Sequence, residues 1–171
     1  MYYINCFFVY SFLGFFFESI VTKIMGNKFE SGVMFGPYTP VYGFGVILII
    51  VLSKYLFYNL HIPRWIETII VFIVLFFILT LLEWIGGIFI EKVFGTVFWD
   101  YSRFKFHIGH YIALEVSLAW AFLSILLIYF VHPHLDKFIH KIPVYLTYIF
   151  IIVFLIDTTC TILKYKFHMF Q

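Results

Sequence analysis

Long apolar stretches separated by short polar turns dominate the chain. A membrane-spanning helix needs about 20 mostly apolar residues, and the pattern predicts five such spans within one transmembrane domain covering residues 1–171. The expected spans are residues 3–24, 41–58, 66–90, 111–131 and 143–163. The predicted fold class is therefore all-α, a polytopic transmembrane helical bundle, since helices satisfy their backbone groups internally in lipid.

An irregular Gly/Pro segment interrupts this pattern after the first span. Residues 32–45, GVMFGPYTPVYGFG, contain no charged side chain. Pro37 and Pro40 prevent a continuous helix. The segment either is buried in protein or lines a cavity, or it forms a tight interfacial turn that leads into the second span.

An interfacial aromatic loop follows the third span. From Arg103 to Ile108 it alternates cationic and apolar side chains, which predicts an extended segment at the membrane surface. The residues of interest in this loop are Trp99, Asp100, Tyr101, Arg103, His107 and His110. Further on, HPHLDKFIHKIP at residues 132–143 predicts a polar turn with solvated histidines.

Composition places the chain in the bilayer. The 171 residues are 64% hydrophobic and 12% charged, against about 25% charged in soluble domains. Because lipid is as apolar as leucine, helix association must rest on small residues, hydrogen bonds and buried polar groups. The basic residues form no run that would bind nucleic acid, and Cys6 and Cys160 have no metal-site spacing.

Acidic residues lie inside the predicted spans, where an ionised carboxylate costs roughly 2.5–3.5 kcal/mol on insertion scales. They are Glu18, Glu83, Glu115 and Asp157, with Glu91 at the end of a span. These acids either hydrogen-bond in protonated form between helices, bind a cation or cationic substrate, or face a hydrated cavity. We predict a shared polar interior; the alternative for each acid is structural contact between helices.

Helical spacing gathers polar and small residues into stripes. The first span carries Ser11, Gly14 and Glu18 on one face, and the third carries Glu83, Gly87 and Glu91. We expect the two stripes to face each other, with Gly87 admitting a neighbouring backbone. The Trp-Asp-Tyr-Ser segment would lie beside them. On the fourth span, the residues expected opposite Glu115 are Ala113, Ser117, Trp120 and Ser124.

Catalytic and metal-binding patterns are weak. His107 and His110, with Asp100 or Glu115, supply metal-ligand types, but two interfacial histidines explain the pattern better. Asp100, Ser102 and His107 are the residue types of a hydrolytic triad, yet no nucleophile elbow is present. The chain also lacks a phosphate-binding loop. We therefore predict no enzyme activity and no cofactor.

The distribution of basic residues predicts the orientation in the membrane. With five spans, the loops on the side of the C-terminus hold seven Lys and Arg residues: Lys23, Lys28, Lys92, Arg103, Lys105, Lys164 and Lys166. The other side holds four: Lys54, Arg64, Lys137 and Lys141. The positive-inside rule then favours the N-terminus outside and the C-terminus inside.

Several blocks resemble one family of bacterial membrane proteins, described as "putative ABC-transporter type IV" or ABC transporter permease. They are YSFLGFFFES (10–19), GPYTPVYGFG (36–45), LEWIGGIFIEKVFGTVFWDYS (82–102) and HPHLDKFIHKIP (132–143). The chain departs from the family pattern at Phe15, where tryptophan is usual, and at residues 107–110, where an arginine is usual. The resemblance implies a polytopic membrane protein and no catalytic residues.

These observations lead to one functional hypothesis and one rival. The leading hypothesis is a permease-like transport component of a bacterial cytoplasmic membrane, with a carboxylate-lined interior that binds a cation or a cationic substrate, or couples transport to protons. The expected partners are membrane lipids and either a second copy of the chain or a separate ATPase or transporter subunit. The rival is a non-transporting membrane subunit, regulator or lipid-interacting scaffold.

Overall fold

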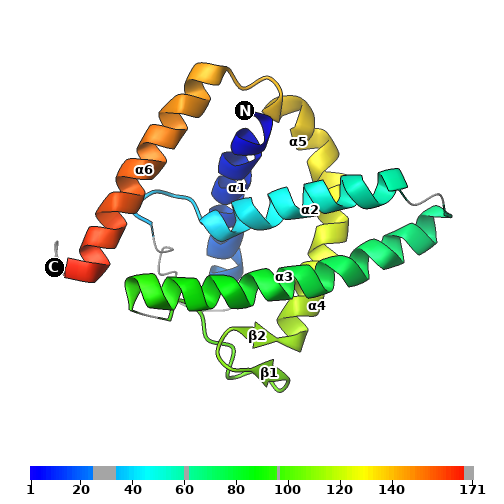
Figure 1. Cartoon of the computed structure of the whole chain (residues 1–171), viewed down its shortest axis with the longest axis horizontal. Coiled ribbons are helices and arrows are strands. Elements are labelled where there is room, and N and C mark those ends of the chain that lie inside the picture. The colour runs from blue at the N-terminus through cyan, green and yellow to red at the C-terminus, as the bar shows by residue number, and fades with distance from the viewer. Residues whose placement is uncertain (25–33, 60–61, 96, 168–171) are drawn as a thin grey trace. The chain divides into compact units, whose positions relative to one another are not determined.

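The protein is a bundle of long apolar helices. The computed structural model describes residues 1–24, 34–59, 62–95 and 97–167, and five helical runs in these residues are long and apolar enough to cross a membrane. They are α1 (Tyr2–Ile24), α2 (Pro40–Asn59), α3 (Arg64–Phe94), α4 to α5 (Leu114–Ile139) and α6 (Val144–Phe167) (Figure 1). The chain is therefore an all-α multi-pass membrane protein, which confirms the predicted fold class.

Backbone contacts divide the chain into two compact units. The first unit comprises Met1–Ile47 and Lys137–Gln171, and the second comprises Leu48–Asp136. The first contains α1, the start of α2 and α6; the second contains the rest of α2, α3 and α4. The prediction of a single transmembrane domain stays a prediction.

In the first unit, glycine lets α1 approach the start of α2. A Cβ atom added to Gly43 would lie 2.3 Å from the Ser11 hydroxyl oxygen, and one added to Gly14 would lie 2.3 Å from the Tyr42 ring. Ser11 and Gly14 are buried there. Close packing of this kind holds membrane helices together, since apolar burial alone does not.

A hydrogen bond and aromatic rings join α1 to α6. The Thr147 hydroxyl donates to the Asn5 side-chain oxygen at 2.6 Å, and both residues are buried. Phe154 packs edge-on against Phe7 and Phe8, with ring centroids 5.3 and 5.9 Å away. Polar and aromatic contacts therefore fix α6 beside α1 over several turns.

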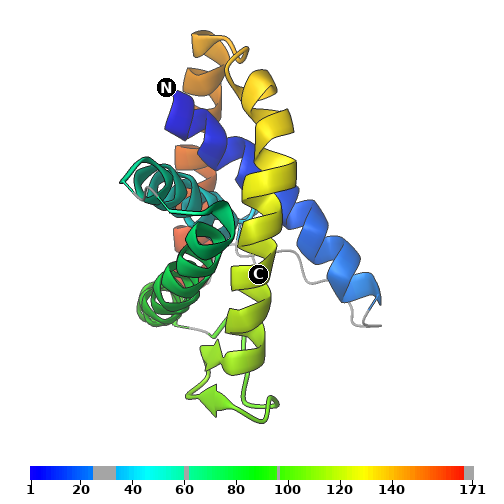
Figure 2. The same cartoon turned by 90° about the vertical axis from the view of Figure 1, so that its right-hand side faces the viewer.

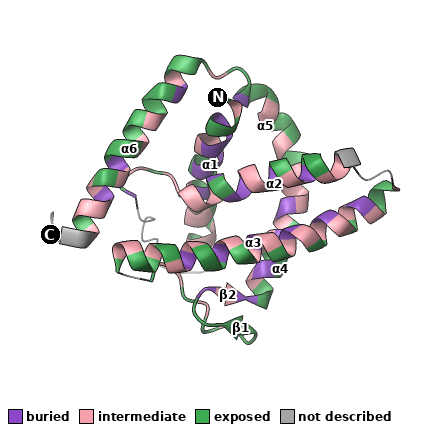
Figure 3. Ribbon diagram, in the orientation of Figure 1, coloured by how far each residue is buried: buried purple, intermediate pink, exposed green. Residues whose placement is uncertain are grey.

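In the second unit, α3 packs against α4. The core cluster contains Ile49 of α2 and three residues of α3 spaced by four: Val71, Leu75 and Leu79. The face that α4 buries carries Ala113, Ser117, Ala121 and Ser124, whereas Glu115 is exposed. Figure 3 shows these alternating buried and exposed positions along α3 and α4. Of the residues predicted opposite Glu115, Ala113, Ser117 and Ser124 are buried and Trp120 is half-buried, whereas Glu115 itself is exposed.

The fourth helical run continues through the segment that the sequence predicts as a polar turn. Helix α4 (Leu114–Leu126) passes into the π-helical segment η1 (Leu127–Val131) and then into α5 (His132–Ile139). Pro133 explains the wide turn, because it lacks a backbone N–H and its ring conflicts with the carbonyl one turn earlier. The predicted turn is wrong over His132–Ile139, where the residues are helical.

The interfacial loop folds into a turn and a hairpin. Strands β1 (His107–Ile108) and β2 (Ile112–Ala113) pair antiparallel immediately before α4 (Figure 2). The extended segment predicted over Arg103–Ile108 is therefore wrong except at its last two residues. A backbone hydrogen bond from Phe104 N to the Tyr101 carbonyl, 2.9 Å long, closes a turn in place of the expected strand. Local turn bonds outweigh the two-residue alternation in this short loop.

Candidate functional site

Glu83 is a buried carboxylate in α3 whose two oxygens differ in their hydrogen bonding. Its Oε1 atom accepts hydrogen bonds from the Tyr101 hydroxyl at 2.7 Å and from the Trp120 indole N–H at 3.2 Å. Its Oε2 atom is fully buried and has no hydrogen-bond partner among the described residues. The side chain is 9% exposed. A buried carboxylate oxygen without a donor is costly, so this position calls for a proton, a cation or water.

Three separate elements build the Glu83 site. Helix α3 supplies the carboxylate, α4 supplies Trp120, and the turn after α3 supplies Tyr101. The backbone N–H of Tyr101 donates to the His110 carbonyl at 2.8 Å, which ties this turn to the hairpin. The Tyr101 hydroxyl is therefore held over the membrane-buried part of α3 by the interfacial loop.

Gly87 and Glu91 continue the Glu83 stripe, and Tyr111 covers both. A Cβ atom added to Gly87 would lie 2.4 Å from the Tyr111 ring, and the Tyr111 hydroxyl donates to Glu91 Oε2 at 2.5 Å. The hydrogen bond to Glu91, with burial, raises the pKa of Tyr111 to about 12. The nearest neighbour of Gly87 is therefore an aromatic ring of its own unit, whereas the sequence predicts the approach of a neighbouring backbone.

Ser117 adds a second unpaired polar atom on α4. Its hydroxyl oxygen is buried and has no hydrogen-bond partner among the described residues. In the sequence Ser117 lies between Tyr111, which precedes β2 and covers Gly87, and Trp120 of α4, which contacts Glu83. Ser117 is therefore on the same α3–α4 contact face as the unpaired Glu83 oxygen.

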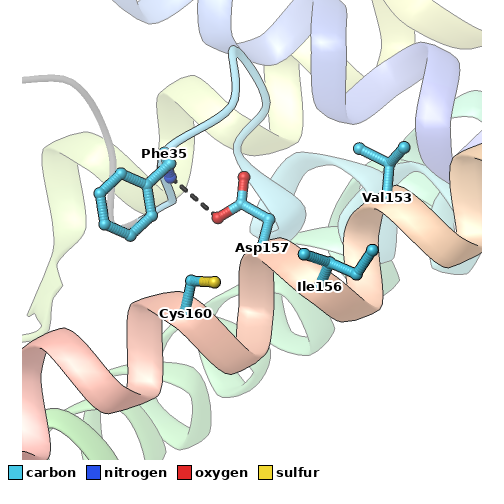
Figure 4. A pocket seen from close by; sticks show the side chains of 5 residues that line it. All are labelled: Phe35, Val153, Ile156, Asp157 and Cys160. Carbon is cyan, nitrogen blue, oxygen red and sulfur yellow. Dashed lines mark hydrogen bonds between the residues drawn. The ribbon is translucent and has the colours of Figure 1, made fainter.

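Asp157 is the best-satisfied acid of the first unit. Its Oδ1 atom accepts from the backbone N–H of Phe35 at 3.0 Å and from the Thr161 hydroxyl at 3.0 Å. Its Oδ2 atom accepts from the backbone N–H of Gly36 at 2.7 Å and from the Tyr38 hydroxyl. Figure 4 shows the carboxylate directed at the Phe35 backbone.

These four donors fill the carboxylate and bind residues 35–38 to α6. Burial, and then the bonded Asp157, raise the pKa of Tyr38, so its hydroxyl stays a donor. Phe35 also lines a groove, which favours the cavity-lining interpretation of the Gly/Pro segment over a plain turn. Gly32 and Val33 of that segment lie outside the described residues. Asp157 is therefore a structural tie with no oxygen left over for a ligand.

Glu18 and Glu115 have different surroundings. Glu18 is half-buried on α1, one turn beyond the Gly14 position that Tyr42 covers. Glu115 is exposed in the first turn of α4, where the helix dipole favours a carboxylate. The five acids thus fall into two units, with Glu83, Glu91 and Glu115 in one and Glu18 and Asp157 in the other. A contact between the Gly14 and Gly87 stripes stays a prediction.

The exposed loop brings Asp100 to His110. Asp100 Oδ1 lies 3.3 Å from His110 Nδ1 and accepts bonds from the Ser102 hydroxyl and its backbone N–H. The two Ser102 donors, with a smaller contribution from His110, lower the pKa of Asp100 to about 2. His107 instead contacts the Gly109 carbonyl, so the triad types Asp100, Ser102 and His107 do not assemble. The described residues contain no cluster of three metal-ligand side chains.

A comparison with protein families identifies the chain. The model of the family described as "Putative ABC-transporter type IV" matches residues 5–162 of the 171. The chain belongs to this family. No curated protein and no solved structure matches it. Membership in a putative ABC-transporter family, with five apolar helices, fits a membrane transport component, and the family description concerns transport rather than catalysis.

The aromatic partners of the acids were not apparent from spacing in this ABC-transporter type IV sequence. Tyr38 lies 119 residues from Asp157, and Trp120 lies 37 residues from Glu83. A usable signal existed in composition, because the chain has 13 tyrosines and four tryptophans that can donate hydrogen bonds. Each intramembrane acid needs a donor, and this chain has few internal cations to supply one.

Proposed function

We propose that this ABC-transporter type IV family member is a permease-like transport component of a bacterial cytoplasmic membrane. Its buried carboxylates bind a cation or a cationic substrate, or carry protons coupled to transport, and Glu83 is the residue on which this action depends. The unpaired Oε2 atom of Glu83 carries the proposal. Ionisable residues within membrane spans commonly mark ion paths and proton relays.

The acids have unequal roles in this proposal. Glu83 supplies the reactive oxygen, while Tyr101 and Trp120 hold its other oxygen in place. Glu91, exposed at the end of α3, lies at the mouth of the site with Tyr111. Asp157 organises residues 35–38, and Glu18 and Glu115 are further acids of the proposed polar interior.

Energy for transport would come from a partner. The chain has no phosphate-binding loop of its own, so a separate ATPase subunit is the partner that the family description implies. A second copy of the chain is the other candidate, since one bundle of this length offers a small interior. Both assignments belong to the proposal.

The test uses vesicles from the native membrane, where a partner subunit is retained. Proton movement is followed with a trapped pH-sensitive dye, and cation uptake with rubidium and methylammonium as probes. Glu83→Gln is expected to lower the flux of the transported probe about tenfold or more, because the loss of a charge interaction of about 1.4 kcal/mol changes binding by that factor. Glu67→Gln, in the same helix but paired with Arg64 at 3.1 Å, is the matched control. Unchanged flux in Glu83→Gln vesicles with normal insertion would reject the proposal.

One set of contacts favours a second function, a non-transporting membrane subunit, regulator or lipid-interacting scaffold. Asp157 is saturated by donors, and Glu91 is bonded to Tyr111, so two of the five acids serve as ties between elements. On this alternative Glu83 would be a third structural contact between elements, with a water molecule bonded to its Oε2 atom. A stable protein partner in a native purification, with all three probes immobile in wild-type vesicles, would favour it.

A further inference from the structure

A groove runs along the exposed face of α6 in the first unit. It has a volume of about 500 Å³ and is lined by Phe35, Val153, Ile156, Asp157 and Cys160 (Figure 4). Because both oxygens of Asp157 are taken by hydrogen bonds, the lining offers an apolar surface. Val153 and Ile156 are 49% and 59% exposed, so the described residues of the first unit leave the groove open.

A second hollow lies beside the first. It measures about 280 Å³ and is lined by Leu155, Ile156, Thr159 and Cys160. Ile156 and Cys160 belong to both hollows and are four residues apart, so they form a ridge along the helix with one hollow on each side. Two parallel apolar hollows suit a pair of acyl chains better than a single chain.

Lys164 stands at one end of the groove. It follows Cys160 by one helical turn on the same face, and its ammonium group lies 5.1 Å from the centre of the Phe35 ring that lines the groove. The distance from residue 153 to residue 164 is about 16 Å at the helical rise. That length matches one leaflet, half of a hydrocarbon core about 30 Å thick. The cation therefore lies at headgroup depth when the hollows lie at acyl-chain depth.

We propose that this α6 groove is a binding site for an anionic phospholipid. The two acyl chains lie on either side of the Ile156–Cys160 ridge, and the headgroup phosphate pairs with Lys164. The match of the distance from Val153 to Lys164 to one leaflet, and the charge complementarity at Lys164, single out a lipid as occupant. The site is independent of the Glu83 site and of whether the protein transports anything.

The test measures lipid binding to the purified full-length protein by native mass spectrometry, with phosphatidylglycerol and phosphatidylethanolamine as probes. Wild type is expected to bind phosphatidylglycerol about fivefold more tightly, the effect of one basic residue near an anionic headgroup. Lys164→Gln should remove this preference. Lys141→Gln, an exposed lysine before the other end of α6, should retain it. Equal preference in the wild type and Lys164→Gln proteins would overturn the proposal.

Two further measurements address the groove itself. Ile156→Trp should reduce binding of both lipids, whereas Val144→Trp, also exposed but outside the hollows, should not. A second measurement needs no substitution: in the wild-type protein, phosphatidylglycerol should slow the modification of Cys160 by maleimide. Cys160 reactivity that is independent of added lipid would contradict the site. Disulfide-linked dimers through Cys160 in a Cys6→Ser protein, unaffected by lipid, would assign the groove to a second copy instead.

Discussion

At the scale of single residues, glycine and aromatic side chains decide how the acids are held. Gly86 and Gly87 are adjacent on α3, yet only Gly87 is in contact: an added Cβ atom meets Tyr111 at 2.4 Å there and nothing within 4 Å at Gly86. The pair gives a matched test of close packing beside Glu83 and Glu91. Spacing alone predicts that Gly87 packs closely, but it does not predict that a tyrosine ring is the neighbour.

Gly87→Ala is expected to destabilise the protein by about 1–3 kcal/mol, because the Tyr111 ring must move from a packed position. Gly86→Ala should be neutral or stabilise by up to about 1 kcal/mol through helix propensity. Unfolding in mixed micelles with increasing denaturing detergent measures both. Equal losses of stability in the two variants would show that the Tyr111 contact is not the cause.

Asp157 gives a second prediction for one residue. Asp157→Asn keeps the shape but removes the charge that four donors surround, and hydrogen bonds to a charged group contribute about 1.5–3 kcal/mol. We expect a loss of that order and faster proteolysis at residues 34–39. Thr159→Ala, whose exposed hydroxyl bonds only within its own helix, is the control. Unchanged proteolysis in Asp157→Asn would mean that other contacts hold the segment.

At the scale of elements, apolar length predicts the spans, whereas the connections depend on interactions that spacing does not reveal. The polar sequence at residues 132–143 predicts a turn, but the helix continues to Ile139. The π-helical segment before Pro133 accommodates the proline without ending the helix. The alternation from Arg103 predicts a strand, but turn bonds at Tyr101 and Phe104 prevail. Short polar connections contain few residues, so one or two local backbone hydrogen bonds can outweigh their pattern.

The loop from Asp100 to His110 has a predictable pH dependence. The two Ser102 donors lower the pKa of the Asp100 carboxylate from 3.8 to about 2. The bonds therefore stabilise the loop fully above pH 3.8 and are lost as pH falls through about 2. Carboxyl carbon NMR shifts should report this titration, and Ser102→Ala should return it towards the ordinary value. A midpoint near 3.8 in the wild-type protein would contradict the bonded arrangement.

At the scale of the whole molecule, family and fold class were both accessible from the sequence, because five long apolar runs and four motif blocks are local features. The grouping of the acids was not. Glu83 meets Trp120 of α4 and Tyr101 of the loop, and Asp157 meets Phe35 and Gly36, through contacts between distant parts of the chain. The number of acids predicts a shared polar interior. The structure distinguishes Asp157, whose two oxygens both accept hydrogen bonds, from Glu83, whose Oε2 atom accepts none from the described residues.

The orientation in the membrane is a testable property of the whole chain. With the five predicted spans, seven of the 11 Lys and Arg residues are expected on the side of the C-terminus, namely Lys23, Lys28, Lys92, Arg103, Lys105, Lys164 and Lys166. A fluorescent protein fused to the C-terminus should therefore fluoresce inside the cell, and alkaline phosphatase fused there should be inactive. The opposite pair of results would reverse the assigned orientation.

The proposed function depends most directly on one atom, the Oε2 oxygen of Glu83, which has no hydrogen-bond partner in the described part of the chain. An apolar carbodiimide modifies protonated carboxyl groups in apolar surroundings, and peptide mass spectrometry locates the product. We predict that Glu83 in native membranes is modified, that modification falls as pH rises or as rubidium or methylammonium is added, and that the saturated Asp157 is not modified. Unmodified Glu83 at every pH, or modification that neither pH nor either cation changes, would contradict the account.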